Sequence, residues 1–355
     1  MKRSAWVAID FAALQHNLRQ VRAYAPESQV MAVIKANAYG HGVLPVAEAL
    51  NSANGFAVSC IEEALELRHA GFIHPILVLQ GHQNFADLQT AASNKLRLVI
   101  HDYAQLQWLE QFPLSKPVDV ALKIDTGMHR LGIPASEARK VYQRLNDNRN
   151  IKRGCWLITH FSCADDTSCD YTDRQISLFR QQTHGIQAVR SMANSAGIIA
   201  WKASHANWVR PGIMLYGSSP MLNGDRDKQG LKAVMSLYAP LIAIHNLNKG
   251  DAIGYGATWT CPEDMPVGVV ACGYADGYPR HAPSGTPVWV NGKESQILGR
   301  VSMDMISIDL RGCYADVGDT VELWGKHISI DRVAALAGTI SYELLCNVGN
   351  LCQRL

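Results

Sequence analysis

Short apolar segments alternate with segments of helical periodicity between about residues 11 and 230. The apolar segments have the length and composition of buried strands, which we predict at 30–34, 56–59, 76–79, 96–100, 118–124, 156–160, 191–194 and 209–215. Amphipathic segments between them predict helices, among them 12–23, 61–70, 104–112, 135–145 and 175–190. Because strands that alternate with helices pair in parallel, this half is predicted to be an α/β, TIM-like (β/α)8 barrel.

The pattern changes after about residue 232. Segments rich in β-branched and aromatic residues, separated by Gly, Pro and Asp, occur at 251–260, 267–274, 286–290, 296–310 and 320–324. A helix is predicted only near 330–337. We therefore divide the chain into a barrel domain over 1–232 and a mostly β domain over 233–355. The first ten or so residues of the barrel domain are expected to pack on the other domain.

Composition narrows the classes of protein. Apolar residues make up 48% of the 355-residue chain, and the formal net charge is +2, without the basic stripe that a nucleic-acid-binding protein needs. No apolar segment is long enough to span a bilayer, and the N-terminus lacks the apolar core of a signal peptide, so a cytoplasmic protein with no membrane partner is expected. The nine cysteines lack metal-site spacing and are expected to be reduced, with no bound metal.

Lys35 stands directly after the first predicted barrel strand, at 30–34. In a (β/α)8 barrel the active site lies at the carboxyl ends of the strands, so this lysine is a candidate for chemistry. A partly desolvated lysine has a lowered pKa and can form a Schiff base with a carbonyl cofactor. On its own, an exposed lysine at a strand end would be the commoner explanation.

Further candidate residues lie in or directly after other predicted strands. They are Lys123, Arg130, His160, Asn194, Ser195, Arg210 and Gly212. Taken singly, these residues have ordinary structural interpretations. Arg210 could be half of a buried ion pair, and His160 could be a structural histidine. Lys123 could extend its charged end into solvent. Together they place phosphate-binding groups near the last two strands, where barrels commonly bind phosphate. With Lys35, the set predicts the phosphorylated carbonyl cofactor pyridoxal 5′-phosphate (PLP). The functional role that fits His160 best is to orient Arg210 or another residue that contacts the cofactor. A GxGxxG motif is absent after the first strand, which disfavours a Rossmann fold.

Ordered motifs across nearly the whole chain resemble those of bacterial alanine racemases. They are 32–42 (AVIKANAYGHG), 123–132 (KIDTGMHRLG), 159–161 (THF), 193–196 (ANSA), 209–213 (VRPGI), 254–257 (GYGA), 273–278 (GYADGY), 301–304 (VSMD) and 341–344 (SYEL). The resemblance implies a homodimer with shared active sites, in which Lys35 holds PLP and the partner subunit supplies Tyr255. It further implies that these two residues are the catalytic bases, Lys35 for D-alanine and Tyr255 for L-alanine.

The resemblance also implies roles for the other site residues. Asn194 would contact the cofactor, and its phosphate would be bound by Tyr39, Ser195, Gly212, Ile213 and Tyr342. Arg210 would face the pyridine nitrogen, and Arg130 would bind the phenolic oxygen and the substrate carboxylate. The partner's Met303 would bind that carboxylate too, while Tyr274 and Tyr342 would narrow the entrance. Lys123 matches a position that is often carbamylated.

Alternatives remain open from the sequence. They are a racemase of serine or of several amino acids, a PLP amino-acid decarboxylase of the same fold, and a non-catalytic PLP-binding protein. The last resembles the barrel alone, so the β domain disfavours it.

Overall fold

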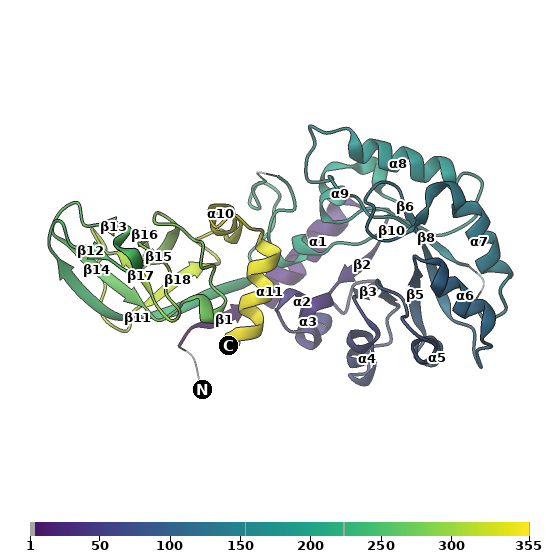
Figure 1. Cartoon of the computed structure of the whole chain (residues 1–355), viewed down its shortest axis with the longest axis horizontal. Coiled ribbons are helices and arrows are strands. Elements are labelled where there is room, and N and C mark those ends of the chain that lie inside the picture. Colours follow the sequence, from purple (N-terminus) through teal and green to yellow (C-terminus); the bar gives the residue numbers. More distant parts are fainter. Residues whose placement is uncertain (1–3, 153, 223, 355) are drawn as a thin grey trace.

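The computed structural model describes residues 4–152, 154–222 and 224–354. A barrel surrounded by helices and a β domain lie at opposite ends of the long axis, with α11 between them (Figure 1). The predicted fold class is confirmed.

Within the described residues, eight parallel strands form a closed ring. Their order is β5-β4-β3-β2-β10-β9-β8-β6, and pairing of β5 with β6 closes the barrel. The strands are β2 (Gln29–Val33), β3 (Gly55–Val58), β4 (Ile76–Val78), β5 (Leu96–Ile100), β6 (Asp119–Asp125), β8 (Trp156–Ile158), β9 (Arg190–Ser191) and β10 (Trp208–Val209). The short β7 (Ile133–Pro134) pairs with the end of β6. Continuous apolar sequence suits these strands because both faces are covered.

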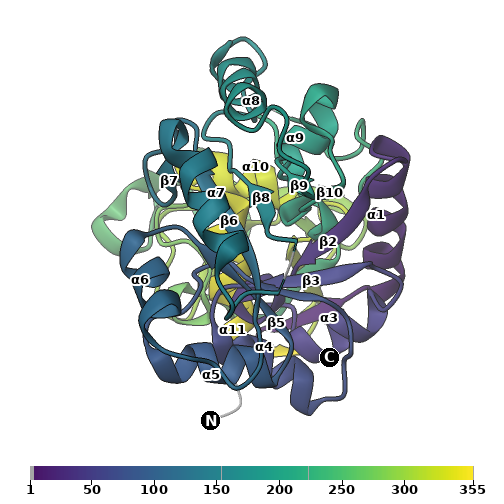
Figure 2. The same cartoon turned by 90° about the vertical axis from the view of Figure 1, so that its right-hand side faces the viewer.

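Helices surround the strands (Figure 2). They are α1 (Phe11–Tyr24), α3 (Val43–Ala49), α4 (Ile61–His69), α5 (Phe85–Ser93), α6 (Tyr103–Gln111), α7 (Ala138–Asp147) and α8 (Tyr171–Gln182), with the shorter α2 (Lys35–Tyr39), η1 (Ala135–Glu137), α9 (Ser195–Ala200), η2 (Lys202–Ser204) and η3 (Ile213–Tyr216). In α1, Asp10 caps the first turn by accepting the Ala13 N–H at 2.8 Å, and Leu14, Leu18 and Val21 are buried.

The β domain is a second, antiparallel ring. Its order is β11-β14-β17-β16-β15-β18, and β18 pairs back with β11. The strands are β11 (Met235–Leu247), β14 (Met265–Val270), β15 (Pro287–Val290), β16 (Lys293–Leu298), β17 (Ile306–Asp309) and β18 (Thr320–Trp324). β1 (Trp6–Ile9) pairs antiparallel with β11, and β19 (Gln353–Arg354) pairs with β1. A hairpin of β12 (Ala252–Ile253) and β13 (Trp259–Thr260), the turns η4 (Tyr255–Ala257) and η5 (Tyr274–Asp276), and helices α10 (Ile330–Leu336) and α11 (Ser341–Leu351) complete it.

Several predicted elements are wrong in extent. The strand predicted at 209–215 ends at Val209, since Pro211 and Gly212 interrupt it before η3. The helix predicted at 175–190 is α8, which starts earlier and ends at Gln182, before Gly185 with its φ of +74°. The segment 296–310 is split into β16 and β17 by a loop that begins at Gly299, where φ is +69°. Left-handed backbone favours glycine and ends regular structure at these positions.

Helix α11 was not predicted. Gly349 inside it lowers intrinsic helix propensity, so its sequence alone gives a weak signal. Close packing against α2 supports it instead: a Cβ on Gly349 would lie 2.1 Å from the Gly40 carbonyl oxygen. Helix α11 therefore forms because it packs against α2, and not because of its intrinsic helix propensity.

Within the described part of the chain, no helix combines the length and the apolar character needed to cross a membrane. All nine cysteines are free thiols, as expected.

Candidate functional site

A cavity of about 380 Å³ opens at the carboxyl ends of the barrel strands. Every predicted site residue of the barrel lines it, and Tyr342 joins them from α11. The lining residues are Val33, Lys35, Ala36, Tyr39, Leu79, Lys123, Arg130, Ile158, Thr159, His160, Asn194, Ser195, Arg210, Gly212, Ile213, Tyr342 and Cys346. The parallel strands thus bring together side chains that are far apart in the sequence.

Lys35 starts an unusual turn, α2, directly after β2. Residues 36–39 all have φ between +52° and +53°, although none is glycine. Left-handed backbone costs roughly 1–2 kcal/mol per such residue, so the turn needs support from its surroundings. Asn37 Oδ1 accepts the Val43 N–H at 2.8 Å, and Glu63 Oε1 accepts the Ala36 N–H at 2.7 Å.

The environment of Lys35 favours the neutral amine. Burial lowers its pKa most, and the positive charge of Arg130 lowers it further. Glu63 and Cys346 act in the opposite direction without cancelling the effect. A neutral lysine amine is the nucleophilic form, which suits attack on a carbonyl.

A second group of cations lies deeper in the cavity. Burial and the charges of Arg210, Arg130 and Lys35 lower the pKa of Lys123 to about 8. Burial also lowers the pKa of Arg210 to about 10, so it stays charged at neutral pH. The pKa of His160 is held well below its usual value by burial and the same cations, which keeps the imidazole neutral.

Arg210 is rigidly held. Its Nη1 donates to the Ser191 carbonyl at 2.9 Å and to the Ser191 hydroxyl at 2.6 Å. Its Nη2 donates to the Thr159 carbonyl at 2.5 Å. The acceptors of these bonds lie at the ends of β8 and β9, and they fix the position of the guanidinium. Its positive charge there contributes to the lowered pKa of His160. The predicted orienting role of His160 stays a prediction.

The opposite wall of the cavity is small and polar. Ser195 Oγ accepts the Gly212 N–H at 2.9 Å, which joins α9 to the segment after β10. A Cβ on Gly212 would lie 2.5 Å from the Tyr39 hydroxyl oxygen, so glycine lets that hydroxyl approach the backbone closely. The Tyr39 ring stacks on Tyr216 with centroids 4.7 Å apart. Hydroxyl groups and close backbone approach are what a phosphate requires.

The charged side chains that line the cavity are all positive among the described residues. Lys35, Lys123, Arg130 and Arg210 line the cavity, and no Asp or Glu is among its described lining residues. Such a site attracts anions, for example a phosphate or the carboxylate of an amino acid.

The β-domain candidates lie elsewhere. Tyr255, Tyr274 and Met303 are 68%, 40% and 53% exposed, and none belongs to the described lining of the Lys35 cavity. Tyr255 sits between Gly254 and Gly256, whose φ values of +73° and +75° form a sharp turn that projects from the domain. In one chain, the structure therefore does not bring Tyr255 and Lys35 together.

Glu63 and Cys346 are among the residues at the site that sequence reasoning missed. Glu63 lies in the first turn of α4 and contacts the backbone next to Lys35. Its position two residues after the start of a helix that follows a barrel strand is the signal that could have found it. Cys346 gives no such signal, because α11 itself was not predicted.

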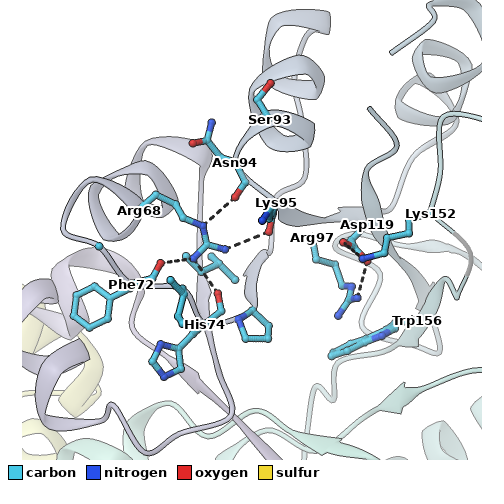
Figure 3. A pocket seen from close by; sticks show the side chains of 14 residues that line it. Arg68, Phe72, His74, Ser93, Asn94, Lys95, Arg97, Asp119, Lys152 and Trp156 are labelled. Atoms are coloured by element: carbon cyan, nitrogen blue, oxygen red, sulfur yellow. Dashed lines mark hydrogen bonds and ion pairs between the residues drawn. The ribbon is translucent and has the colours of Figure 1, made fainter. Parts of the chain in front are cut away.

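A second cavity, of about 700 Å³, lies at the other end of the barrel, where strands begin (Figure 3). Arg68 donates to four backbone carbonyls of the loops before β4 and β5. Arg97 pairs with Asp119 at 3.0 Å and lies 3.7 Å from the Trp156 ring centroid, and Lys152 also approaches Asp119. Because these charges are paired within the fold, we assign the residues a structural role at the base of the barrel.

Comparison with known families identifies the chain. Residues 9–220 match the alanine racemase N-terminal domain, and residues 234–355 match the alanine racemase C-terminal domain. The chain belongs to the alanine racemase family. It is therefore an enzyme of the racemase class.

Relatives cover the chain almost completely. The alanine racemase of Halorhodospira halophila is 47% identical over 350 residues, which are 98% of this chain and 96% of that protein. That of Nitrosococcus oceani is 50% identical over 344 residues, 96% of each.

Solved alanine racemases have the same fold. The crystal structure of the biosynthetic alanine racemase from Pseudomonas aeruginosa superposes with a TM-score of 0.96 at 42% identity, covering 100% of this chain and 99% of that one. The Acinetobacter baumannii structure gives a TM-score of 0.94 at 37% identity and covers 99% of each chain.

Proposed function

We propose that the protein interconverts L-alanine and D-alanine with PLP bound to Lys35. Two bases would transfer the Cα proton: Lys35 itself and Tyr255 of the partner subunit. The observation that carries the proposal is the Lys35 amine, with its lowered pKa, in a cavity lined by cations and by no described carboxylate. The family to which the chain belongs supports the substrate.

The residues of the cavity fit PLP in charge and in shape. Tyr39, Ser195 and Tyr342, which carry hydroxyl groups, line the cavity together with Gly212, and would hold the phosphate. Bound there, PLP would withdraw electrons from the substrate and acidify its Cα–H bond. Asn194 and Ile213 would complete the cofactor contacts.

Charged side chains would orient cofactor and substrate. Arg210, fixed by backbone carbonyls, would face the pyridine nitrogen and disfavour its protonation. Arg130 would bind the substrate carboxylate, as arginine commonly does. With the carboxylate fixed, the Cα–H is held in line with a base.

Inversion at Cα needs a base on one face and an acid on the other. Lys35 would remove the Cα proton of D-alanine, and the partner subunit's Tyr255 would remove the Cα proton of L-alanine. The exposure of Tyr255, and its absence from the described lining of its own chain's cavity, support a second copy as the acceptor. The partner's Met303 N–H would contact the substrate carboxylate, and the partner's Tyr274 would narrow the entrance beside Tyr342.

Lys123 would act as a carbamate. The neutral amine nitrogen would bond to the carbon of CO₂ and release one proton to water, and a pKa of about 8 makes the neutral amine available near neutral pH. The product is an anion beside Arg130 and Arg210, which removes repulsion among cations and positions Arg130.

The decisive experiment incubates the purified protein with PLP and single L-amino acids and follows the products by chiral chromatography. D-alanine from L-alanine is expected. Equal turnover of serine or of several amino acids would broaden the substrate assignment. Release of CO₂ without a D-product would indicate a decarboxylase, and PLP binding without turnover would indicate a binding protein.

A further inference from the structure

The lysine turn depends on contacts from outside it. Residues 36–39 hold a left-handed conformation that non-glycine residues avoid, so the direction of the Lys35 side chain is set by neighbouring elements. Asn37 fastens the far end of the turn to α3 through the Val43 N–H. The near end, next to Lys35, is fastened by Glu63.

Glu63 uses both carboxylate oxygens. Oε1 accepts the Ala36 N–H at 2.7 Å, and Oε2 accepts the Ser59 N–H at 2.6 Å. The Ala36 N–H belongs to the peptide bond that follows Lys35. One side chain thus connects the end of β3, the start of α4 and the lysine turn, and bonds to a charged acceptor are the strong ones.

Few charged or titratable side chains act on the amine of Lys35. Arg130 faces the amine from the loop after β6 and Cys346 from α11, while Lys123 and His160 line the same cavity. Glu63 is the carboxylate whose negative charge acts on the amine, and it opposes the effect of burial and of Arg130.

We propose that Glu63 is a positioning residue for the reaction: its carboxylate clamps the peptide after Lys35 and holds the amine in the geometry and charge balance needed to bind PLP. The inference rests on the proposed function, because it takes Lys35 as the cofactor-binding lysine. Glu63 is not among the described residues that line the cavity, and it acts through the backbone next to Lys35.

The test measures how fast the cofactor-free protein forms the visible absorption band of lysine-bound PLP, as a function of pH. Glu63→Gln keeps one acceptor oxygen and removes the charge. Since attack requires the neutral amine, we expect the midpoint of the rate profile to move to lower pH by roughly half a unit or more. Glu62→Gln makes the same charge change on the exposed neighbour in the same helical turn and should leave the midpoint unchanged.

A companion variant separates geometry from charge. Glu63→Asp keeps the charge but shortens the reach, so the rate should fall several-fold at every pH with the midpoint unchanged. A Glu63→Gln profile that superposes on the wild type would overturn the proposal, and so would an equal shift in Glu62→Gln. If Glu63→Gln does not fold, Glu63→Asp decides, and a wild-type rate in that variant refutes the clamp. Failure of the wild-type protein itself to form the band would instead refute the proposed function.

Discussion

At the scale of single residues, burial and neighbouring charge determine what each polar group can do. Lys35 and Lys123 are both lysines in one cavity, and both have lowered pKa values. Lys35 follows a strand end and starts a turn that Glu63 fastens, and the proposed function assigns its amine to attack on the cofactor. Lys123 is inside β6 among cations, and the proposed function assigns its amine to carbamate formation.

The role of Lys35 predicts a sharp loss on substitution. Lys35→Ala should abolish the visible band of lysine-bound PLP and lower racemase activity by roughly 10³-fold or more, because it removes both an anchor and a base. Absorbance spectra and racemisation assays measure the two effects. A normal band in this variant would exclude Lys35 as the cofactor lysine.

The role of Tyr255 predicts one-sided proton exchange. The equilibrium between the enantiomers is fixed, so Tyr255→Phe must slow racemisation equally in both directions, by roughly 10²–10⁴-fold. In D₂O, D-alanine should still exchange its Cα hydrogen through Lys35, whereas L-alanine should not. NMR of each enantiomer measures this. Exchange of both at wild-type rates would contradict the two-base scheme.

The pKa of Lys123 predicts a pH-dependent modification. With the pKa lowered from 10.5 to about 8, the neutral fraction of the amine rises steeply as pH increases through 8 instead of through 10.5. At constant dissolved ¹³CO₂, a carbamate signal in ¹³C NMR should therefore grow between about pH 7 and about pH 9. Lys123→Met serves as the control, since it lacks the amine. The same signal in that variant would place the carbamate elsewhere.

At the scale of elements, contact between α11 and the lysine turn connects the two domains at the site. Cβ atoms on Gly40 and Gly349 would lie 2.3 Å from the Leu345 carbonyl oxygen and 2.1 Å from the Gly40 carbonyl oxygen, respectively. This approach brings Tyr342 and Cys346 to the cavity. An active-site wall thus depends on two glycines that carry no chemistry.

Gly349→Ala should therefore weaken both stability and cofactor binding. The added methyl group has no room and forces α11 away from α2, at a cost of roughly 1–3 kcal/mol. Thermal unfolding and PLP titration measure the effects. Asn347→Ala, at an exposed position of the same helix, should change neither. A wild-type PLP affinity in Gly349→Ala would show that the contact does not shape the site.

At the scale of the whole molecule, the proposed site needs two chains. Large apolar and aromatic side chains, among them Tyr255, Tyr274, Met303 and Met305, are exposed on the β domain. Exposed groups of this kind mark interaction surfaces. In a dimer, each Lys35 would meet the Tyr255 of the other subunit.

Mixing two inactive variants tests this directly. Lys35→Ala and Tyr255→Phe chains, unfolded together and refolded, should form hybrid dimers with one intact site, and activity should recover to about a quarter of the wild type by random pairing. Each variant refolded alone is the control. If sites were formed within single chains, mixing would restore nothing.

Most of the fold was predictable because buried parallel strands carry continuous apolar sequence. The same regularity made the strand-end residues from Lys35 to Gly212 predictable as a group. Element boundaries were less predictable: Gly185 and Gly299 end elements that periodicity alone extends. Glu63 and Cys346 were missed because their importance depends on what lies opposite them, which no local pattern encodes.

The closed parallel barrel, the lysine at the end of its first strand and the family motifs could be predicted from the sequence alone. They follow from local composition and from the rule that parallel strands end at one face. Three features are visible only in the folded chain: α11 forms a wall of the cavity, Glu63 binds the backbone of the lysine turn, and Tyr255 lies outside the described lining of its own chain's cavity. The reason is physical: burial, close approach and charge balance arise between segments distant in sequence, so they exist only once the chain has folded.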